Sequence, residues 1–199
     1  MSAPLTSIDA LLADIRACRA CAPELPHEPR PVVRVRTETR ILVLGQAPGR
    51  LVNESGLPFD DPSGERLRGW MGVDRATFYD HPAIGVAGMA FCYPGTDRNG
   101  ADYPPMPRCA ELWHRRLLAE LPQIELPLLV GSYALVWVLG RTGARSVTET
   151  VRAWRGFPAS QLPLPHPSWR NTGWLKRNPW FEAEVMPYLR QRVSEILSR

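Results

Sequence analysis

Two short motifs carry polar side chains that could perform chemistry in this chain of 199 residues. The first is Gly45-Gln46-Ala47-Pro48-Gly49, in which Gln46 follows directly after the apolar run 41–44. The second is His166-Pro167-Ser168, which follows the apolar segment 161–164. Parallel sheets present ligand-binding groups at the carboxyl ends of their strands, so we expect both motifs to face one site. A histidine there could stabilise developing charge, and a glutamine could orient water through its carbonyl oxygen.

The four cysteines form a second group of reactive side chains. Cys18 and Cys21 are separated by two residues, whereas Cys92 and Cys109 bracket a long loop over residues 92–108. A chain without a secretory signal is not expected to carry structural disulfides. Four thiolates in two pairs suit zinc or an iron–sulfur cluster, and the wide spacing of the second pair favours a cluster. On spacing alone, four free or buried cysteines are an open alternative.

Apolar strands alternate with helical segments along the whole chain. Short apolar runs ended by turn residues predict strands, and apolar residues at helical spacing predict helices between them. Such alternation is typical of a parallel sheet covered on both faces. We therefore expect an α/β fold, a three-layer α/β/α sandwich with a central four-stranded parallel sheet, as one domain over residues 1–199. The expected strands are 41–44, 84–91, 126–130 and 161–164. The expected helices are 8–18, 63–70, 74–78, 109–121 and 133–139. A last helix is expected to start at Pro179 and must kink or restart at Pro187.

Composition and charge narrow the classes of partner and location. The formal net charge is +4, and Lys176 is the only lysine among 24 basic side chains. Arginine binds phosphate in a bidentate manner, so this bias suits nucleic acid, although codon bias in a GC-rich genome would produce it too. No apolar run approaches the length of a membrane span, and residues 1–4 lack the basic-then-apolar order of a secretory signal. We expect a cytoplasmic protein with no membrane association.

An ordered set of motifs over residues 14–190 resembles the uracil-DNA glycosylase superfamily, most closely its iron–sulfur branch, family four. Each motif is modest alone, but their order and spacing together are specific. The motifs that carry the resemblance are Cys18–Cys21, Gly45–Gly49, Gly56-Leu57-Pro58-Phe59, Ser63-Gly64, Cys92 with Cys109, and His166-Pro167-Ser168.

This resemblance implies a monomeric enzyme that flips a deaminated base, uracil or a related one, out of DNA and hydrolyses its N-glycosidic bond in base-excision repair. It implies that His166 stabilises the anionic leaving base, that Gln46 stands on the water side, and that Phe59 stacks on the base. Backbone amides of the first-strand turn would hold phosphates. The implied substrate-binding residues are Gly45, Ala47, Pro48, Gly49, Phe59, Ser168, Arg170 and Asn171, and the implied ligands of a 4Fe-4S cluster, or of zinc as the alternative, are Cys18, Cys21, Cys92 and Cys109.

Two positions depart from the family-four pattern. Gln46 stands where that branch has an acidic residue, and glutamine cannot act as a general base. Asp61 is a candidate substitute, because Asp61-Pro62-Ser63-Gly64 resembles a segment of family-five enzymes in which an aspartate is implicated in catalysis; a carboxylate at a helix start is the compatible structural interpretation. Gly88 stands where an asparagine reads uracil. The preferred base is therefore open, and a lesion- or abasic-site-binding protein with little turnover is the alternative function.

Overall fold

A five-stranded sheet in the order β1-β3-β2-β4-β5 forms the centre of the computed structural model, which describes residues 7–140, 146–158 and 161–199. The four strands β2 to β5 are parallel, and β1 pairs antiparallel with β3 at one edge. The bounds are β1 Val33–Arg34, β2 Ile41–Gly45, β3 Ile84–Gly88, β4 Leu126–Val130 and β5 Leu162–Leu164.

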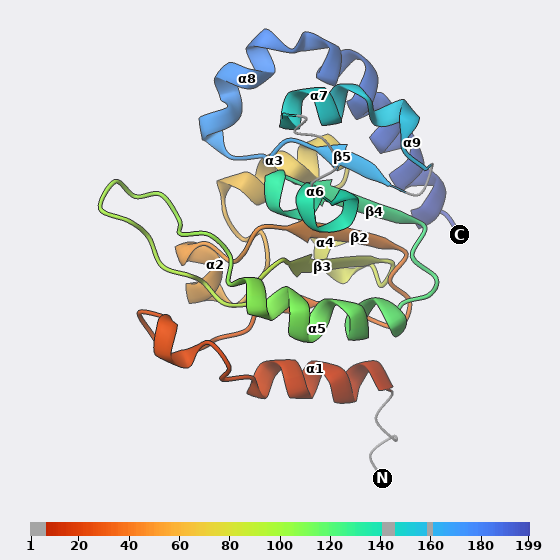
Figure 1. Ribbon diagram of the computed structural model, residues 1–199. Coiled ribbons are helices and arrows are strands. Elements are labelled where there is room, and N and C mark those ends of the chain that lie inside the picture. Colours follow the sequence, from red (N-terminus) through yellow and green to blue (C-terminus); the bar gives the residue numbers. More distant parts are fainter. Residues whose placement is uncertain (1–6, 141–145, 159–160) are drawn as a thin grey trace.

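Helices cover both faces of this sheet, which gives three layers (Figure 1). One layer contains α1 (Ser7–Ala17), α5 (Pro107–Ala119) and α6 (Ser132–Leu139). The opposite layer contains α3 (Pro62–Met71), α4 (Arg75–Asp80), α7 (Val147–Arg152) and α9 (Met186–Leu197). Two short helices, α2 (Arg50–Ser55) and α8 (Thr172–Arg177), follow the loops at the carboxyl ends of β2 and β5.

Strand β2 shows why an apolar run without polar alternation forms a central strand. Ile41 and Val43 pack into the core beside α3 and α9, whereas Leu42 and Leu44 pack into the core beside α1 and α5. All four side chains are at most 2% exposed. Burial of such a side chain contributes about 1.5–3 kcal/mol, so both faces of the strand stabilise its central position.

The predicted α/β/α fold is confirmed, with corrections in detail. The short edge strand β1 makes five strands where four were expected, because two residues are too few for a periodic signal. The strand expected over 84–91 ends at Gly88, where the chain turns toward the end of β2. The cap expected at Ser63 is at Asp61, whose side chain accepts the Gly64 N–H.

The C-terminal helical region begins at Pro179 as expected and changes its winding before Pro187. Residues Phe181–Val185 form a π-helical turn, and α9 continues from Met186. Proline lacks the N–H that an α-helix needs at this position, and a wider turn is one way to accommodate it. Within the described ranges, no helix combines the length and the apolar character that a membrane crossing requires.

Candidate active site

A cavity of about 350 Å³ lies at the carboxyl ends of the parallel strands, between the turn after β2 and the loop after β5. Every residue that the sequence predicted to be catalytic or substrate-binding lines this cavity. They come from distant parts of the chain, and the shared edge of the parallel sheet brings them together. These residues are Gly45, Gln46, Ala47, Pro48, Gly49, Phe59, Asp61, His166, Ser168, Arg170 and Asn171.

Phe59 is held over the end of β2 by an unusual backbone conformation. Its φ is 57°, in the left-handed region that few residues other than glycine adopt. Its carbonyl accepts a hydrogen bond from Arg68 at 3.1 Å, and a Cβ on Gly64 would lie only 1.8 Å from that carbonyl oxygen. A Cβ on Gly45 would meet the Phe59 ring at 3.4 Å. The ring therefore packs directly on the backbone of Gly45 and forms an aromatic wall of the cavity.

His166 is oriented by its own loop. Its Nδ1 accepts the Ser168 N–H at 3.2 Å, and its carbonyl accepts a hydrogen bond from the Asn171 side chain at 2.8 Å. Because Nδ1 is an acceptor, the proton of the neutral ring is on Nε2. Burial lowers the pKa of His166, and the negative charge of Asp61 offsets part of this decrease. The net lowering keeps the ring a neutral Nε2–H donor near neutral pH.

Asp61 lines the same cavity as His166, and it also has a role in the fold. Its Oδ1 accepts the Gly64 N–H at 2.7 Å and thereby caps α3. The same helix carries Arg66, which donates to the Ser168 carbonyl at 2.9 Å. Helix α3 is thus bonded to the loop that contains His166. This bond fixes the Asp61 carboxylate relative to the imidazole.

Gln46 and Gly88 define the part of the cavity where the sequence departs from the resembled pattern. The Gln46 amide donates to the Tyr103 carbonyl at 3.4 Å, which leaves its oxygen available as an acceptor. A Cβ at Gly88 would lie 2.6 Å from the Ala90 carbonyl oxygen, so no side chain fits there without a backbone shift. The buried His114 ring bonds the Gly88 carbonyl at 2.9 Å from behind. At Gly88, where the resembled pattern has an asparagine side chain, the wall of the cavity is therefore formed by backbone atoms.

Asp102 also lines the cavity and was not predicted. The residue lies in the loop between β3 and α5, a segment with no periodic pattern that could single it out. It is exposed at the rim, yet partial desolvation raises the pKa of its carboxyl group, and the neighbouring Asp61 raises it further while Arg170 lowers it. The sequence signal that could have indicated Asp102 is that it is an acidic residue in the loop between Cys92 and Cys109.

A family model described as the uracil DNA glycosylase superfamily matches residues 33–190. The chain belongs to the uracil DNA glycosylase superfamily. Membership supports a DNA glycosylase-like enzyme that acts on DNA. The matched range contains every predicted cavity residue but begins after Cys18 and Cys21, so it does not address the iron–sulfur branch.

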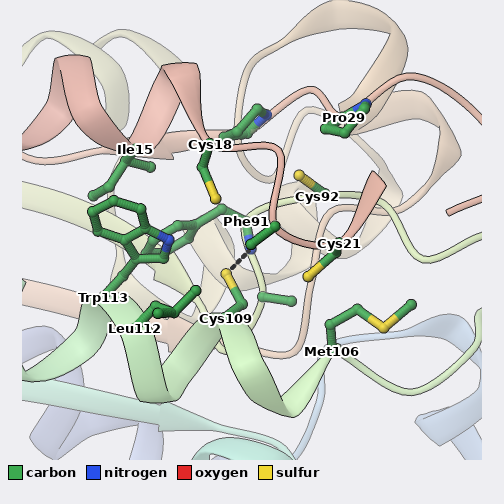
Figure 2. A pocket seen from close by; sticks show the side chains of 13 residues that line it. Ile15, Cys18, Cys21, Pro29, Phe91, Cys92, Met106, Cys109, Leu112 and Trp113 are labelled. Carbon is green, nitrogen blue, oxygen red and sulfur yellow. Dashed lines mark hydrogen bonds between the residues drawn. The ribbon is translucent and has the colours of Figure 1, made fainter. Parts of the chain in front are cut away.

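The four cysteines of this glycosylase superfamily member line a second, small cavity of about 20 Å³. Figure 2 shows their side chains arranged around it, with Ile15, Phe91 and Trp113 nearby. They come from the end of α1, the turn after it, the segment after β3 and the start of α5. All four are free thiols, Cys18, Cys21, Cys92 and Cys109.

These buried thiols are ligands of the type that a positively charged metal group binds. Burial raises the pKa of Cys92 to about 11 and that of Cys109 to about 12, so ionised thiolates there need a compensating positive charge. The Phe91 N–H donates to the Cys109 sulfur at 3.3 Å, as a hydrogen bond to a ligating sulfur would. In the part of the chain that the structure describes, no three His, Cys, Asp or Glu side chains converge closely enough to hold a metal ion. The sulfurs surround a cavity rather than a point.

Proposed function

We propose that this protein is a DNA glycosylase that flips a deaminated base out of DNA and hydrolyses its N-glycosidic bond in base-excision repair. The observation that carries the proposal is that His166 and Asp61 line one cavity, where the charge of Asp61 acts on the pKa of His166 and the Nδ1 of His166 accepts the Ser168 N–H. Such a cavity offers both a donor for the leaving base and a carboxylate for the sugar. A cytoplasmic, monomeric enzyme is part of the same proposal.

His166 stabilises the negative charge on the leaving base. When the bond between C1′ and the ring nitrogen breaks, the electron pair leaves on the base, and negative charge is shared between that nitrogen and a carbonyl oxygen of the base. A neutral Nε2–H pointing at that oxygen stabilises the charge most where water is excluded. One preorganised donor of this kind contributes about 10²–10³-fold in rate. The lowered pKa of His166 suits this role because the ring does not have to be an imidazolium.

The sugar side belongs to the Asp61 carboxylate and Gln46. Positive charge develops on the sugar ring as the base departs, and a fixed carboxylate stabilises it. The free amide oxygen of Gln46 can orient water but cannot take its proton. The Phe59 ring stacks on the flipped base. Backbone N–H groups of the turn at Gly45, Ala47 and Gly49, with Pro48 in the same turn, hold the adjacent DNA strand together with Ser168, Arg170 and Asn171.

The substrate class is a deaminated base rather than uracil alone. The backbone wall at Gly88 leaves no side chain in the position where an asparagine would select uracil. Selection then rests on the shape of the cavity and on backbone groups, which favours testing purine and pyrimidine products of deamination together. Uracil, hypoxanthine and xanthine are the three bases to compare.

Cys18, Cys21, Cys92 and Cys109 would hold a 4Fe-4S cluster with a structural role, and zinc is the less favoured alternative. The observation that supports a shared metal group is that all four thiols line one small cavity, and four Cys thiolates are the ligand set of such a cluster. When bound, the cluster would supply positive charge that stabilises the thiolates. We expect freshly purified protein to contain about four irons per chain. Stoichiometric zinc in colourless protein would contradict the cluster.

The test of the proposed function is strand scission by alkali after incubation with oligonucleotides that contain one lesion. Wild type should cut at one or more of the three bases, and His166→Ala should be at least about 100-fold slower. His81→Ala is the matched control, because His81 is not among the cavity-lining residues and its imidazole Nδ1 accepts the nearby Ala83 N–H. Tight lesion binding without any product would favour the alternative, a lesion- or abasic-site-binding protein, for which Gln46 in place of an acid is the supporting observation.

A further inference from the structure

Asp102 brings a second carboxylate into the candidate active site from the loop over residues 92–108. Its side chain lines the same cavity as Asp61 and His166. Its Oδ2 lies 3.5 Å from the position that a Cβ on Gly49 would occupy. The carboxylate therefore approaches the turn after β2, where the only polar side chain is an amide.

The part of the loop that carries Asp102 is anchored on both sides by residues of the cavity. On one side, the Arg170 guanidinium donates to the Gly100 carbonyl at 2.9 Å. On the other side, the Gln46 amide donates to the Tyr103 carbonyl at 3.4 Å. Residue 102 lies between these two carbonyls, so the loop is tied to both walls of the cavity. The long loop projects from the sheet between β3 and α5 (Figure 1), and these bonds return it to the site.

We propose that Asp102 positions the attacking water and accepts its proton, an assignment that rests on the proposed glycosylase function. In this step the water oxygen forms a bond to C1′, and the bond from C1′ to the base nitrogen breaks. The electron pair leaves with the base, next to the Nε2–H of His166. One water proton passes to the Asp102 carboxylate and then to solvent, and the other remains on the new hydroxyl group. Gln46 orients the same water but has no site for its proton.

The charges around Asp102 favour this role. Partial desolvation and the Asp61 carboxylate raise the pKa of Asp102, and the Arg170 guanidinium opposes them. A carboxylate with a raised pKa is the stronger base. The two carboxylates differ in their surroundings: the Asp61 side chain accepts the Gly64 N–H, whereas Asp102 lines the cavity and is exposed to solvent.

The experiment compares Asp102→Asn with Asp97→Asn in single-turnover and steady-state excision assays. Asp97 is in the same loop but does not line the cavity, and its Oδ1 accepts the N–H groups of Asn99 and Ala101, both at 2.8 Å. Asparagine keeps that acceptor, so Asp97→Asn removes one loop charge without removing the loop's own bonds. We expect Asp102→Asn to lower kcat about 100-fold or more with KM within about threefold, and Asp97→Asn to match wild type.

The pH profile separates a base from a residue that only supports the loop. Wild type should lose activity as acid protonates Asp102, and the pH dependence of its acid limb should change in Asp102→Asn but match wild type in Asp97→Asn. Active wild type with Asp102→Asn at the wild-type rate would overturn the assignment and leave the proposed function intact. Wild type that releases no base from any of the three lesions would overturn both.

Discussion

Asp61 offers the sharpest test of the site because it has one structural bond and one proposed chemical role. Its Oδ1 caps α3 through the Gly64 N–H at 2.7 Å, and its charge faces His166. Asparagine caps a helix about as well as aspartate, whereas alanine does not cap at all. Asp61→Asn therefore removes the charge and keeps the cap, and Asp61→Ala removes both.

The two variants should differ in stability and agree in activity. Loss of the cap costs about 1 kcal/mol, which lowers Tm by about 2–4 °C in a chain of this size. Asp61→Asn loses only the interaction of its charge with the helix dipole, about 0.3–1 kcal/mol. Both variants should excise the base at least about 100-fold more slowly than wild type, because a preorganised charge opposite the developing positive charge is gone in each. Thermal unfolding and the lesion assay measure the two effects separately.

A second helix of the same kind supplies the control. Asp74 caps α4 through the Thr77 N–H at 2.7 Å and does not line the cavity. Asp74→Ala should lower Tm as Asp61→Ala does, yet leave the excision rate unchanged. If Asp61→Asn retained the wild-type rate, Asp61 would be a cap alone. If its Tm fell as far as that of Asp61→Ala, the separation of cap and charge would be wrong.

Two further predictions concern acid and a single glycine. Burial lowers the pKa of both His114 and His166, so between pH 6.5 and their native pKa values the unfolded chain binds more protons than the folded chain. As the pH falls through this range, the unfolding free energy should decrease by about 1.4 kcal/mol per pH unit for each histidine. Denaturant midpoints that stay constant from pH 8 to pH 5 would contradict this. Gly131 has φ +83° and would place a Cβ 3.4 Å from the Cβ of His166, so Gly131→Ala should lower both Tm and the excision rate, whereas Gly156→Ala, where nothing lies within 4 Å, should change neither.

The general position of the site could be predicted because it depends on chain order and strand direction. Buried strands that alternate with helices make a parallel sheet, and the polar residues just after β2 and β5 must then meet at one edge. Gln46 and His166 follow directly from this rule. The four cysteines line one small cavity for a related reason, since α1 and α5 pack on the same face of the sheet.

The finer parts of the site depend on contacts that leave no local signal. Nothing near Arg66 or Arg170 in sequence indicates that their guanidinium groups bond the carbonyls of Ser168 and Gly100. The steric limit at Gly88 likewise comes from the Ala90 carbonyl and the first-strand turn, which only the fold brings close. The sequence can suggest that a residue is missing from a pattern. It cannot say whether a side chain would fit there.

The loop between Cys92 and Cys109 connects the cavity lined by the cysteines with the candidate active site. Cys92 and Cys109 are separated by a segment much longer than a chelating pair needs, which is why their spacing disfavoured zinc. The segment leaves the cysteine cavity, is tied by Arg170 and Gln46 at the candidate active site, and returns to α5. The same long segment that is unusual for a chelating pair therefore brings Asp102 to the candidate active site. Asp102, which we propose as the base that Gln46 cannot be, thus comes from a loop that begins at Cys92 and ends at Cys109.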